Sequence, residues 1–218
     1  MINDILDFSK VDTGKLEMQG IDFALEAQLG DFAEVIAIGT QNKDLELLLD
    51  TEHLDRCWAK GDPGRLRQIL TNLIGNTLKF TSQGQIEVRA ELHPSAPEGL
   101  RLTTAVSDSV IDLPPKALGT VFEPFTYIDA STTRQYGSTG LGLGLGKNLC
   151  GLRGGALHAT SQPGAGSCFE FHIPLVISQQ SDTAPRTYQI LTCGSSTTTP
   201  APITLSASSG STGELRMR

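Results

Sequence analysis

Apolar residues recur at steps of three and four in two long segments of the chain. The first predicts an amphipathic helix over residues 25–42, with a buried face formed by Leu25, Leu29, Phe32 and Ile36. The second predicts a helix over residues 64–80, because Asp62 is a good N-cap and Pro63 is favoured at the first helical position. Residues 1–19 have the pattern of a helix end that stops at Gly20.

Alternation of apolar and polar residues predicts half-buried antiparallel strands elsewhere. One hairpin is expected from residues 86–92 and 100–106 around a loop at 93–99, and another from 156–160 and 168–174 around a turn at 163–166. Residues 45–50 form a shorter strand, residues 108–140 are mostly irregular, and a glycine-rich run at 137–146 leads into a helix. The elements predict an α+β fold, a two-layer sandwich with helices on one face of a mixed, mostly antiparallel sheet.

A narrow polar stripe runs along the predicted helix 64–80. At 100° per residue, its members fall within an arc of about 80°, and apolar residues occupy the rest of the surface. The stripe consists of Arg65, Gln68, Asn72, Asn76 and Lys79. A solvated helix face is usually wider and richer in charge, so the stripe indicates groups pointed at a ligand. Taken alone, the two asparagines are equally compatible with capping or bridging neighbouring loops.

Composition narrows the class of protein. An apolar fraction of 39% and a net charge of −7 fit a soluble globular domain, and no basic run suggests a nucleic-acid or acidic-membrane surface. No apolar stretch approaches the ~20 residues of a membrane span, and no signal peptide is visible at the N-terminus. The four cysteines show no close pairing, which favours a reducing, cytoplasmic location.

Three more motifs suggest binding chemistry. Asp108 follows a predicted strand and can accept a hydrogen bond from an exocyclic amine, although an Asp in this position is commonly a turn former. Phe122 and Phe125 lie in the long irregular segment, where paired aromatics often anchor a loop. The glycine run 137–144 precedes a helix N-terminus and suits phosphate groups, although a glycine run alone is also typical of a linker.

Together these motifs resemble the catalytic ATP-binding domain of sensor histidine kinases, most closely the hybrid type. Residues 62–81 resemble the N-box, 122–125 the F-box, and 137–144 the second glycine box, while 129–134 match the segment before that box. Residues 163–167 resemble the final hairpin turn of that domain. The order and spacing match from about residue 1 to 176, which implies a Bergerat-type ATP site shared in outline with gyrase and MutL.

The resemblance also implies roles for individual residues. Asn76 would ligate Mg²⁺ with Asn72 beside it, Lys79 and Arg134 would serve the phosphates, and Asp108 would recognise adenine. Gly140 and Gly142 would hold the lid against the phosphates. The remaining residues that the resemblance places around ATP are Phe80, Ile111, Leu113, Phe122, Gly137, Thr139, Leu141, Leu143 and Ser167. The cofactors implied are ATP and Mg²⁺, and the γ-phosphoryl group would pass to a histidine nitrogen.

The sequence departs from the family pattern at the first glycine box, which normally reads Asp-x-Gly-x-Gly. Val110 and Asp112 replace both glycines after Asp108. Valine disfavours positive φ, and a second carboxylate is unfavourable beside a polyanion. Each change costs on the order of 1–3 kcal/mol if the glycine conformation must be kept. The helix after the second glycine box also contains Gly144, Gly146 and Gly151, each of which costs roughly 1 kcal/mol relative to alanine.

Three segments are therefore expected. Residues 1–20 resemble the end of the second dimerisation helix, 21–176 the ATPase domain, and 177–218 a flexible tail rich in Ser and Thr. The helix with the phosphoacceptor histidine would lie upstream, so this chain is not expected to phosphorylate itself and should be mainly monomeric. Expected partners are that helix and a response regulator. Two alternatives are a pseudokinase that binds partners without turning over ATP, and an ATPase of the gyrase or MutL group.

Overall fold

The computed structural model describes residues 2–41, 43, 45–54, 57–95, 99–109, 113–126, 140–178 and 215–217. The helices are α1 (Ile2–Asp12), α2 (Leu25–Gln41), α3 (Pro63–Phe80), α4 (Pro115–Thr120) and α6 (Gly142–Leu152). The strands are β1 (Ile21–Ala24), β2 (Glu46–His53), β3 (Trp58–Gly61), β4 (Gln85–Ser95), β5 (Gly99–Asp108), β6 (Ala156–Gln162), β7 (Gly166–Ile177) and β8 (Leu215–Met217). Within these ranges, we find no helix with the length and apolar character that crossing a bilayer requires.

The described strands form one eight-stranded sheet in the order β1-β3-β7-β5-β4-β2-β8, and β6 pairs with β7 outside that path. Strands β4, β5, β7 and β6 pair antiparallel, whereas β2 and β4 run parallel. The register places Asp108, at the end of β5, opposite Ser167 near the start of β7. This pairing brings together two residues that lie far apart in sequence.

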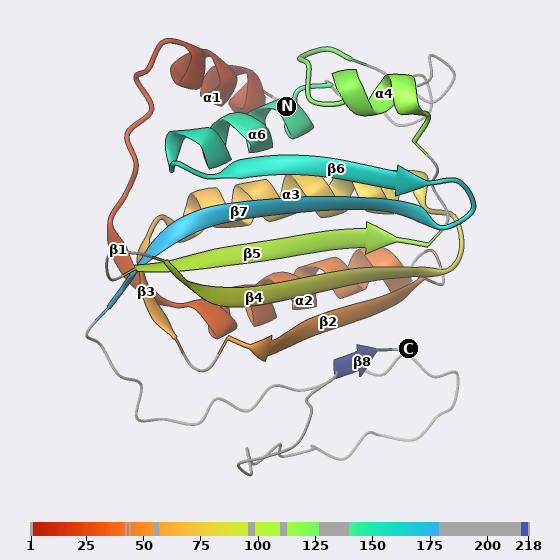
Figure 1. The fold of residues 1–218 in the computed structure, drawn as a ribbon, viewed down its shortest axis with the longest axis horizontal. Helices are drawn as coiled ribbons and strands as arrows, with labels where there is room; N and C mark the ends of the chain where they lie inside the picture. Colours follow the sequence, from red (N-terminus) through yellow and green to blue (C-terminus); the bar gives the residue numbers. More distant parts are fainter. Residues whose placement is uncertain are drawn as a thin grey trace.

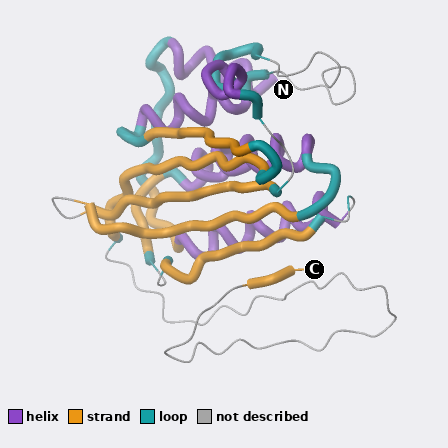
Figure 2. Tube along the Cα trace, turned by 45° about the vertical axis from the view of Figure 1, so that its right-hand side comes forward, coloured by secondary structure: helices purple, strands orange, loops and turns teal. Residues whose placement is uncertain are grey.

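Helices α2 and α3 lie side by side behind the sheet, as Figure 1 shows, and the turned view in Figure 2 keeps them on that side. The core lies between these two helices and the sheet. It includes the fully buried Leu70, Leu73, Ile86, Leu102 and Phe171. The alternating burial of β5 and the wide apolar surface of α3 create this layer. The predicted two-layer α+β sandwich is confirmed.

The predicted start of α3 is confirmed in detail. Asp62 is its N-cap, accepting a 3.0 Å hydrogen bond from the Arg65 N–H, and Pro63 occupies the first turn. The second carboxylate oxygen of Asp62 accepts a 3.0 Å bond from the Gln19 N–H. One buried carboxylate thus fixes both the start of α3 and the segment that joins α1 to β1.

The predicted boundaries differ from the structure in several places. Helix α1 ends at Asp12, not near residue 19, because Gly14 adopts a positive φ of 65° that terminates it. Strands β1 and β3 are too short to show an alternating pattern, and they pair with each other beside β7. Helix α4 begins at Pro115, with Pro114 as its N-cap, in the segment expected to be irregular. Residues 215–217 of the expected tail form β8, paired with β2, and residues 179–214 lie outside the described residues.

Candidate nucleotide site

The polar stripe on α3 divides into two parts with different surroundings. Arg65 Nη1 donates a 2.8 Å hydrogen bond to the Asp7 carboxylate of α1 and a 2.7 Å hydrogen bond to Gln68 Oε1. Gln68 Nε2 donates to the same Asp7 oxygen at 2.8 Å. The interpretation of the whole stripe as ligand-facing is therefore wrong for Arg65 and Gln68, because these two residues hold α1 against α3.

The Asp7 carboxylate is mostly enclosed by this contact, with 17% of its side chain exposed. Burial by itself would raise its pKa, but the hydrogen bonds from Gln68 and Arg65 and the positive charge of Arg65 outweigh burial and lower the pKa. The ionised form of Asp7 is thus the form that binds α3.

Asn72 belongs to the second part of the stripe and faces the start of α6. A Cβ added to Gly142 would lie 3.4 Å from Asn72 Oδ1, so the glycine allows the amide to lie close to the helix N-terminus. Asn72 Nδ2 is buried and has no hydrogen-bond partner among the described residues. The residue before α6, Leu141, has an apolar side chain that cannot cap the helix. A buried amide N–H that has no partner among the described residues, beside a helix N-terminus that the Leu141 side chain does not cap, favours a polar, anionic ligand.

Asn76 and Lys79 follow on the same face of α3, and both are partly buried. Burial lowers the pKa of Lys79, whose Nζ lies 4.8 Å from the centre of the Phe80 ring. The last turn of α3 is fixed by Lys43, whose Nζ donates to Leu78 O at 2.6 Å and to Lys79 O and Thr81 O at 3.3 Å. A cation at the carboxyl end of a helix is favourable for the helix dipole, so Lys43 helps position Lys79.

The predicted adenine-binding end of the site centres on Asp108. Ser167 Oγ donates a hydrogen bond of 2.5 Å to Asp108 Oδ2, and both residues are buried. Gly166 makes the approach of the two strands possible, because its φ is +89° and an added Cβ would clash with the Asp108 carbonyl oxygen. The pair of Asp108 and Ser167 thus occupies a fixed position at the ends of β5 and β7.

The loop after Asp108 is held at both ends. Ser109 Oγ accepts a 3.2 Å hydrogen bond from the Gln85 N–H at its start. Ser161 Oγ accepts a 2.9 Å bond from the Leu113 N–H at its end and donates 3.1 Å to the Gly166 carbonyl. Leu113 is buried, as expected for a residue beside the adenine end. Val110 and Asp112, the two departures from the family pattern, lie outside the described residues.

The F-box segment and the second glycine box contact each other. Phe125 N donates 3.1 Å to Gly140 O, and both residues have positive φ, 60° and 67°. Gly144 lies against the Phe122 carbonyl, where an added Cβ would come within 2.9 Å of the oxygen. The ring of Phe122 packs edge-on against Phe169 of β7, with 6.4 Å between centroids. The expected role of paired aromatics as loop anchors holds for Phe122, whereas Phe125 is 65% exposed.

The structure thus brings several of the predicted site residues into two groups. Asn72 and Gly142 meet between α3 and α6, with Asn76, Lys79 and Phe80 further along α3 and with Leu141 and Leu143 at the start of α6. Asp108, Leu113 and Ser167 form the second group. Ile111, Arg134, Gly137 and Thr139 lie outside the described residues.

Sequence analysis missed Asp7, Lys43 and Ser161 as residues that support the site. Asp7 and Lys43 are charged residues in segments that appeared merely solvated, and no local pattern links them to α3. The position of Ser161 opposite Ser167 in the register of the second hairpin was the available signal.

Comparison with known proteins identifies the family. Residues 61–177 match the family model described as histidine kinase-, DNA gyrase B-, and HSP90-like ATPase. The chain belongs to this family. The match covers α3, the Asp108–Ser167 pair and α6, so it includes every described group of the site.

Its relatives are sensor kinases. The chain is 38% identical over 175 residues to the signal transduction histidine-protein kinase BarA of Escherichia coli (strain K12), which covers 80% of this chain and 19% of BarA. It is 42% identical over 175 residues, with the same two coverages, to the sensor protein GacS of Pseudomonas syringae pv. syringae. The chain thus spans about a fifth of the length of these relatives. It is a histidine kinase-type ATPase domain that is similar to part of these sensor kinases, and the relatives do not favour the pseudokinase alternative.

A solved structure supports the same assignment. The crystal structure of full-length ShkA in complex with AMPPNP superposes with a TM-score of 0.69 at 29% identity, over 81% of this chain and 35% of ShkA. The mostly antiparallel sheet and its helices match that fold, which confirms the Bergerat-type architecture that the motifs implied. The family and this relative agree with ATP as the nucleotide.

Proposed function

We propose that this domain binds Mg-ATP and transfers the γ-phosphoryl group to a histidine on a dimerisation helix outside the sequence given. The observation that supports the proposal most directly is the buried, unpaired Asn72 amide in front of the N-terminus of α6. A phosphate oxygen at that position would accept from Nδ2 and from the first N–H groups of the helix. Asn72 would therefore gain the hydrogen bond that the described residues do not provide.

The residues present also fit Mg²⁺. Amide oxygens are hard, neutral ligands, and Mg²⁺ in nucleotide sites is usually held by few protein groups together with phosphates. Asn76 would provide such an oxygen, with Asn72 beside it on the same face of α3. When bound, the metal ion would neutralise charge on the transferring phosphoryl group. The two amides add no charge of their own, which leaves the metal positive toward the nucleotide.

The other residues position the nucleotide. Asp108, oriented by Ser167, would accept a hydrogen bond from the adenine amine. Lys79 would neutralise a phosphate at the end of α3, and a partly desolvated ammonium interacts more strongly than one in water. Arg134, Gly137 and Thr139 would complete the phosphate contacts from the lid, and Ile111 would line the adenine end. Transfer then depends mainly on positioning and charge neutralisation.

The same proposal assigns partners and location. The domain would act on the phosphoacceptor helix of the whole sensor kinase, and a response regulator would receive the phosphoryl group. This assignment implies a cytoplasmic domain, and the fragment itself would be mainly a monomer. Light scattering of the purified chain would test the last expectation.

Mg-ATP binding can be measured on the purified chain. Saturating Mg-ATP should raise the melting temperature, since a ligand at 100 times its Kd stabilises the native state by about 2.7 kcal/mol. Asn76→Ala should abolish the part of the shift that depends on Mg²⁺, and Asn72→Ala should weaken ATP binding by about tenfold. Gln83→Ala, an exposed loop amide, is the matched control. No shift with millimolar Mg-ATP, or equal shifts in all three variants, would refute the proposal.

A further inference from the structure

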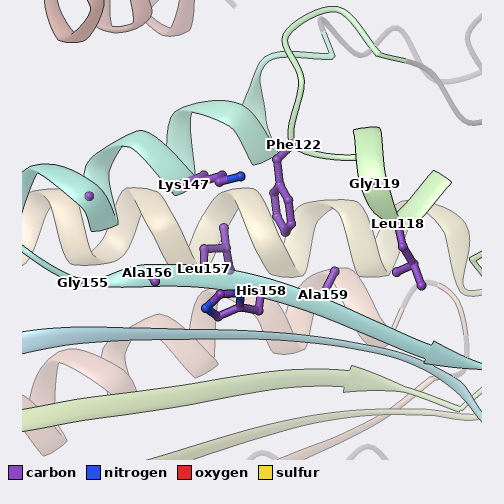
Figure 3. A pocket seen from close by; sticks show the side chains of 10 residues that line it. Leu118, Gly119, Phe122, Lys147, Gly155, Ala156, Leu157, His158 and Ala159 are labelled. Carbon is purple, nitrogen blue, oxygen red and sulfur yellow. The ribbon is translucent and has the colours of Figure 1, made fainter. Parts of the chain in front are cut away.

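A cavity lies on the side of α6 that faces away from Asn72. It has a volume of about 380 Å³ and opens between α4, α6 and β6. Figure 3 shows Phe122 pointing down toward β6, Leu157 pointing up from that strand, and Lys147 reaching across from α6. At 100° per residue, Lys147 and Gly151 of α6 lie about 140° and 180° around the helix from Gly142. The cavity therefore lies on the side of α6 opposite Asn72, and Phe122 is the one residue of its lining that the resemblance also places around ATP.

The lining of this cavity is mixed. Leu118, Phe122 and Leu157 contribute apolar side chains, and Lys147 is the only Lys or Arg among the described residues that line it. The His158 side chain points to the other face of β6, where it stacks on His172 with 6.4 Å between the ring centroids. Gly151 leaves part of the wall without a side chain, since an added Cβ there would meet nothing within 4 Å, whereas the Cβ position of Gly155 is directed at the His172 backbone. No Asp or Glu is among the described residues that line the cavity, although the chain as a whole has a net charge of −7.

Lys147 has no carboxylate partner among the described residues. Its Nζ lies 5.1 Å from the centre of the Phe122 ring, a cation–π contact that holds the ammonium over the cavity. A ligand with an apolar body and one carboxylate would fit this lining. Its apolar body would be buried against Leu118 and Leu157, and its carboxylate would pair with Lys147. A neutral apolar ligand would leave the ammonium unpaired, so charge complementarity favours the carboxylate.

We propose that the cavity between α4, α6 and β6 is a binding site for a small amphiphilic carboxylate, with Lys147 as the residue that recognises the anionic group. The cavity and the nucleotide site both involve α6 and Phe122. Gly144 of α6 lies against the Phe122 carbonyl, and the Phe122 side chain lines the cavity. A bound ligand would thus contact the segment that positions the second glycine box. The proposal requires no nucleotide and is independent of phosphoryl transfer.

Phenylbutyrate and its uncharged counterpart phenylbutyramide are suitable probes for titration of the full chain. We expect saturable binding of phenylbutyrate, with amide chemical-shift changes at Gly151, Gly155 and Leu157, and binding of the amide weaker by about fivefold. Lys147→Gln should weaken the binding of phenylbutyrate by the same factor and leave the affinity for phenylbutyramide unchanged. Lys147 is exposed, so this variant should fold normally.

Two further variants locate the site. Lys60→Gln removes an exposed lysine of β3, outside the cavity, and Asn72→Ala changes the opposite side of α6; both should bind phenylbutyrate like the unchanged chain. Equal affinity for the two probes, loss of binding in Asn72→Ala, or shift changes spread over the surface would each overturn the proposal. Competition by Mg-ATP without any effect of Lys147→Gln would also overturn it, by placing the probe in the nucleotide site.

Discussion

Hydrogen bonds between buried polar side chains fix the geometry of the candidate site at the residue scale. Asp108 and Ser167 are both almost fully buried, and their 2.5 Å hydrogen bond joins two strands. A carboxylate that must accept a bond from a base needs a fixed orientation, and a hydroxyl partner provides it without adding charge. Through this pair, β7 orients the Asp108 carboxylate of β5, which is the residue proposed to recognise adenine.

Ser167→Ala tests this orientation. The change removes the hydrogen bond that Ser167 Oγ donates to the buried Asp108 carboxylate and should lower stability by about 1–3 kcal/mol. It should also reduce the preference for ATP over GTP, because a mobile Asp108 discriminates the exocyclic amine less well. The measurements are a denaturant titration and the affinities for the two nucleotides.

Ser161→Ala is the matched control, since Ser161 holds the Leu113 end of the same loop but does not touch Asp108. It should lower stability by a similar amount and keep the ratio of ATP to GTP affinity. A nucleotide preference unchanged in both variants would mean that Ser167 does not orient Asp108.

At the element scale, helix α6 contains glycines that have different reasons to be there. An added Cβ at Gly144 would lie 2.9 Å from the Phe122 carbonyl oxygen, whereas one at Gly151 meets nothing within 4 Å. The sequence predicts that glycines in α6 lower the stability of this helix. At Gly144, however, the absence of a side chain permits a close contact. There the helix can approach the F-box segment closely.

Gly144→Ala and Gly151→Ala should consequently change stability in opposite directions. Alanine at residue 151 should stabilise the protein by about 0.5–1 kcal/mol through helix propensity. Alanine at residue 144 should destabilise it by about 1–3 kcal/mol, because the Phe122 backbone must move. Chemical denaturation of both variants decides the matter, and equal stabilisation of both would show that the close contact is not formed.

Helices α1 and α3 are joined by a contact that depends on pH. The hydrogen bonds from Gln68 and Arg65 overcome the opposing effect of burial and hold the pKa of Asp7 below its ordinary value of 3.8. A carboxyl whose pKa is lowered by folding stabilises the folded state above the unfolded pKa, and this contribution disappears as the pH falls through the folded pKa. The contact should therefore be complete at neutral pH and lost in acid.

Asp7→Asn should lower the free energy of unfolding by about 1–2 kcal/mol at pH 7. The difference between the variant and the unchanged chain should shrink toward zero below pH 3.8, where the unchanged chain loses the same charge. Denaturant titrations of both proteins at several pH values provide the measurement. A difference that stays constant into acid would show that ionisation of Asp7 does not hold α1.

The sequence predicted the elements that have long, regular patterns and failed where partners are distant. Helix α3 was predicted to within one residue and the strands of both hairpins to within about three residues at each end, since capping and alternation are local signals. The stripe on α3 was correctly recognised as unusual, but its division between Asp7 and the start of α6 depends on how other elements pack. Strands β1 and β3 form by pairing with each other, which a four-residue pattern cannot show.

At the scale of the whole molecule, Asp62 interacts with three separate segments of the chain. Its carboxylate accepts from the Arg65 N–H of α3 and from the Gln19 N–H of the segment after α1. Asp62 also interacts electrostatically with Arg153, which lies just beyond α6. Burial lowers the pKa of the Arg153 guanidinium, and the negative charge of Asp62 opposes this lowering. The start of α3, the segment after α1 and the residue after α6 thus all interact with one buried carboxylate.

Asp62→Ala removes all three interactions, whereas Asp62→Asn keeps the capping oxygen and removes only the charge. The alanine variant should lose about 2–4 kcal/mol of stability, from the lost cap, the unpaired Gln19 N–H and the half-buried Arg153. The asparagine variant should lose about 1 kcal/mol, since Asn is a good N-cap. If Asp62 places α1 relative to α3, hydrogen exchange in α1 should accelerate strongly in the alanine variant and little in the asparagine variant. Equal exchange in both would assign Asp62 to the start of α3 alone, and α1 would then be held by Asp7 without its help.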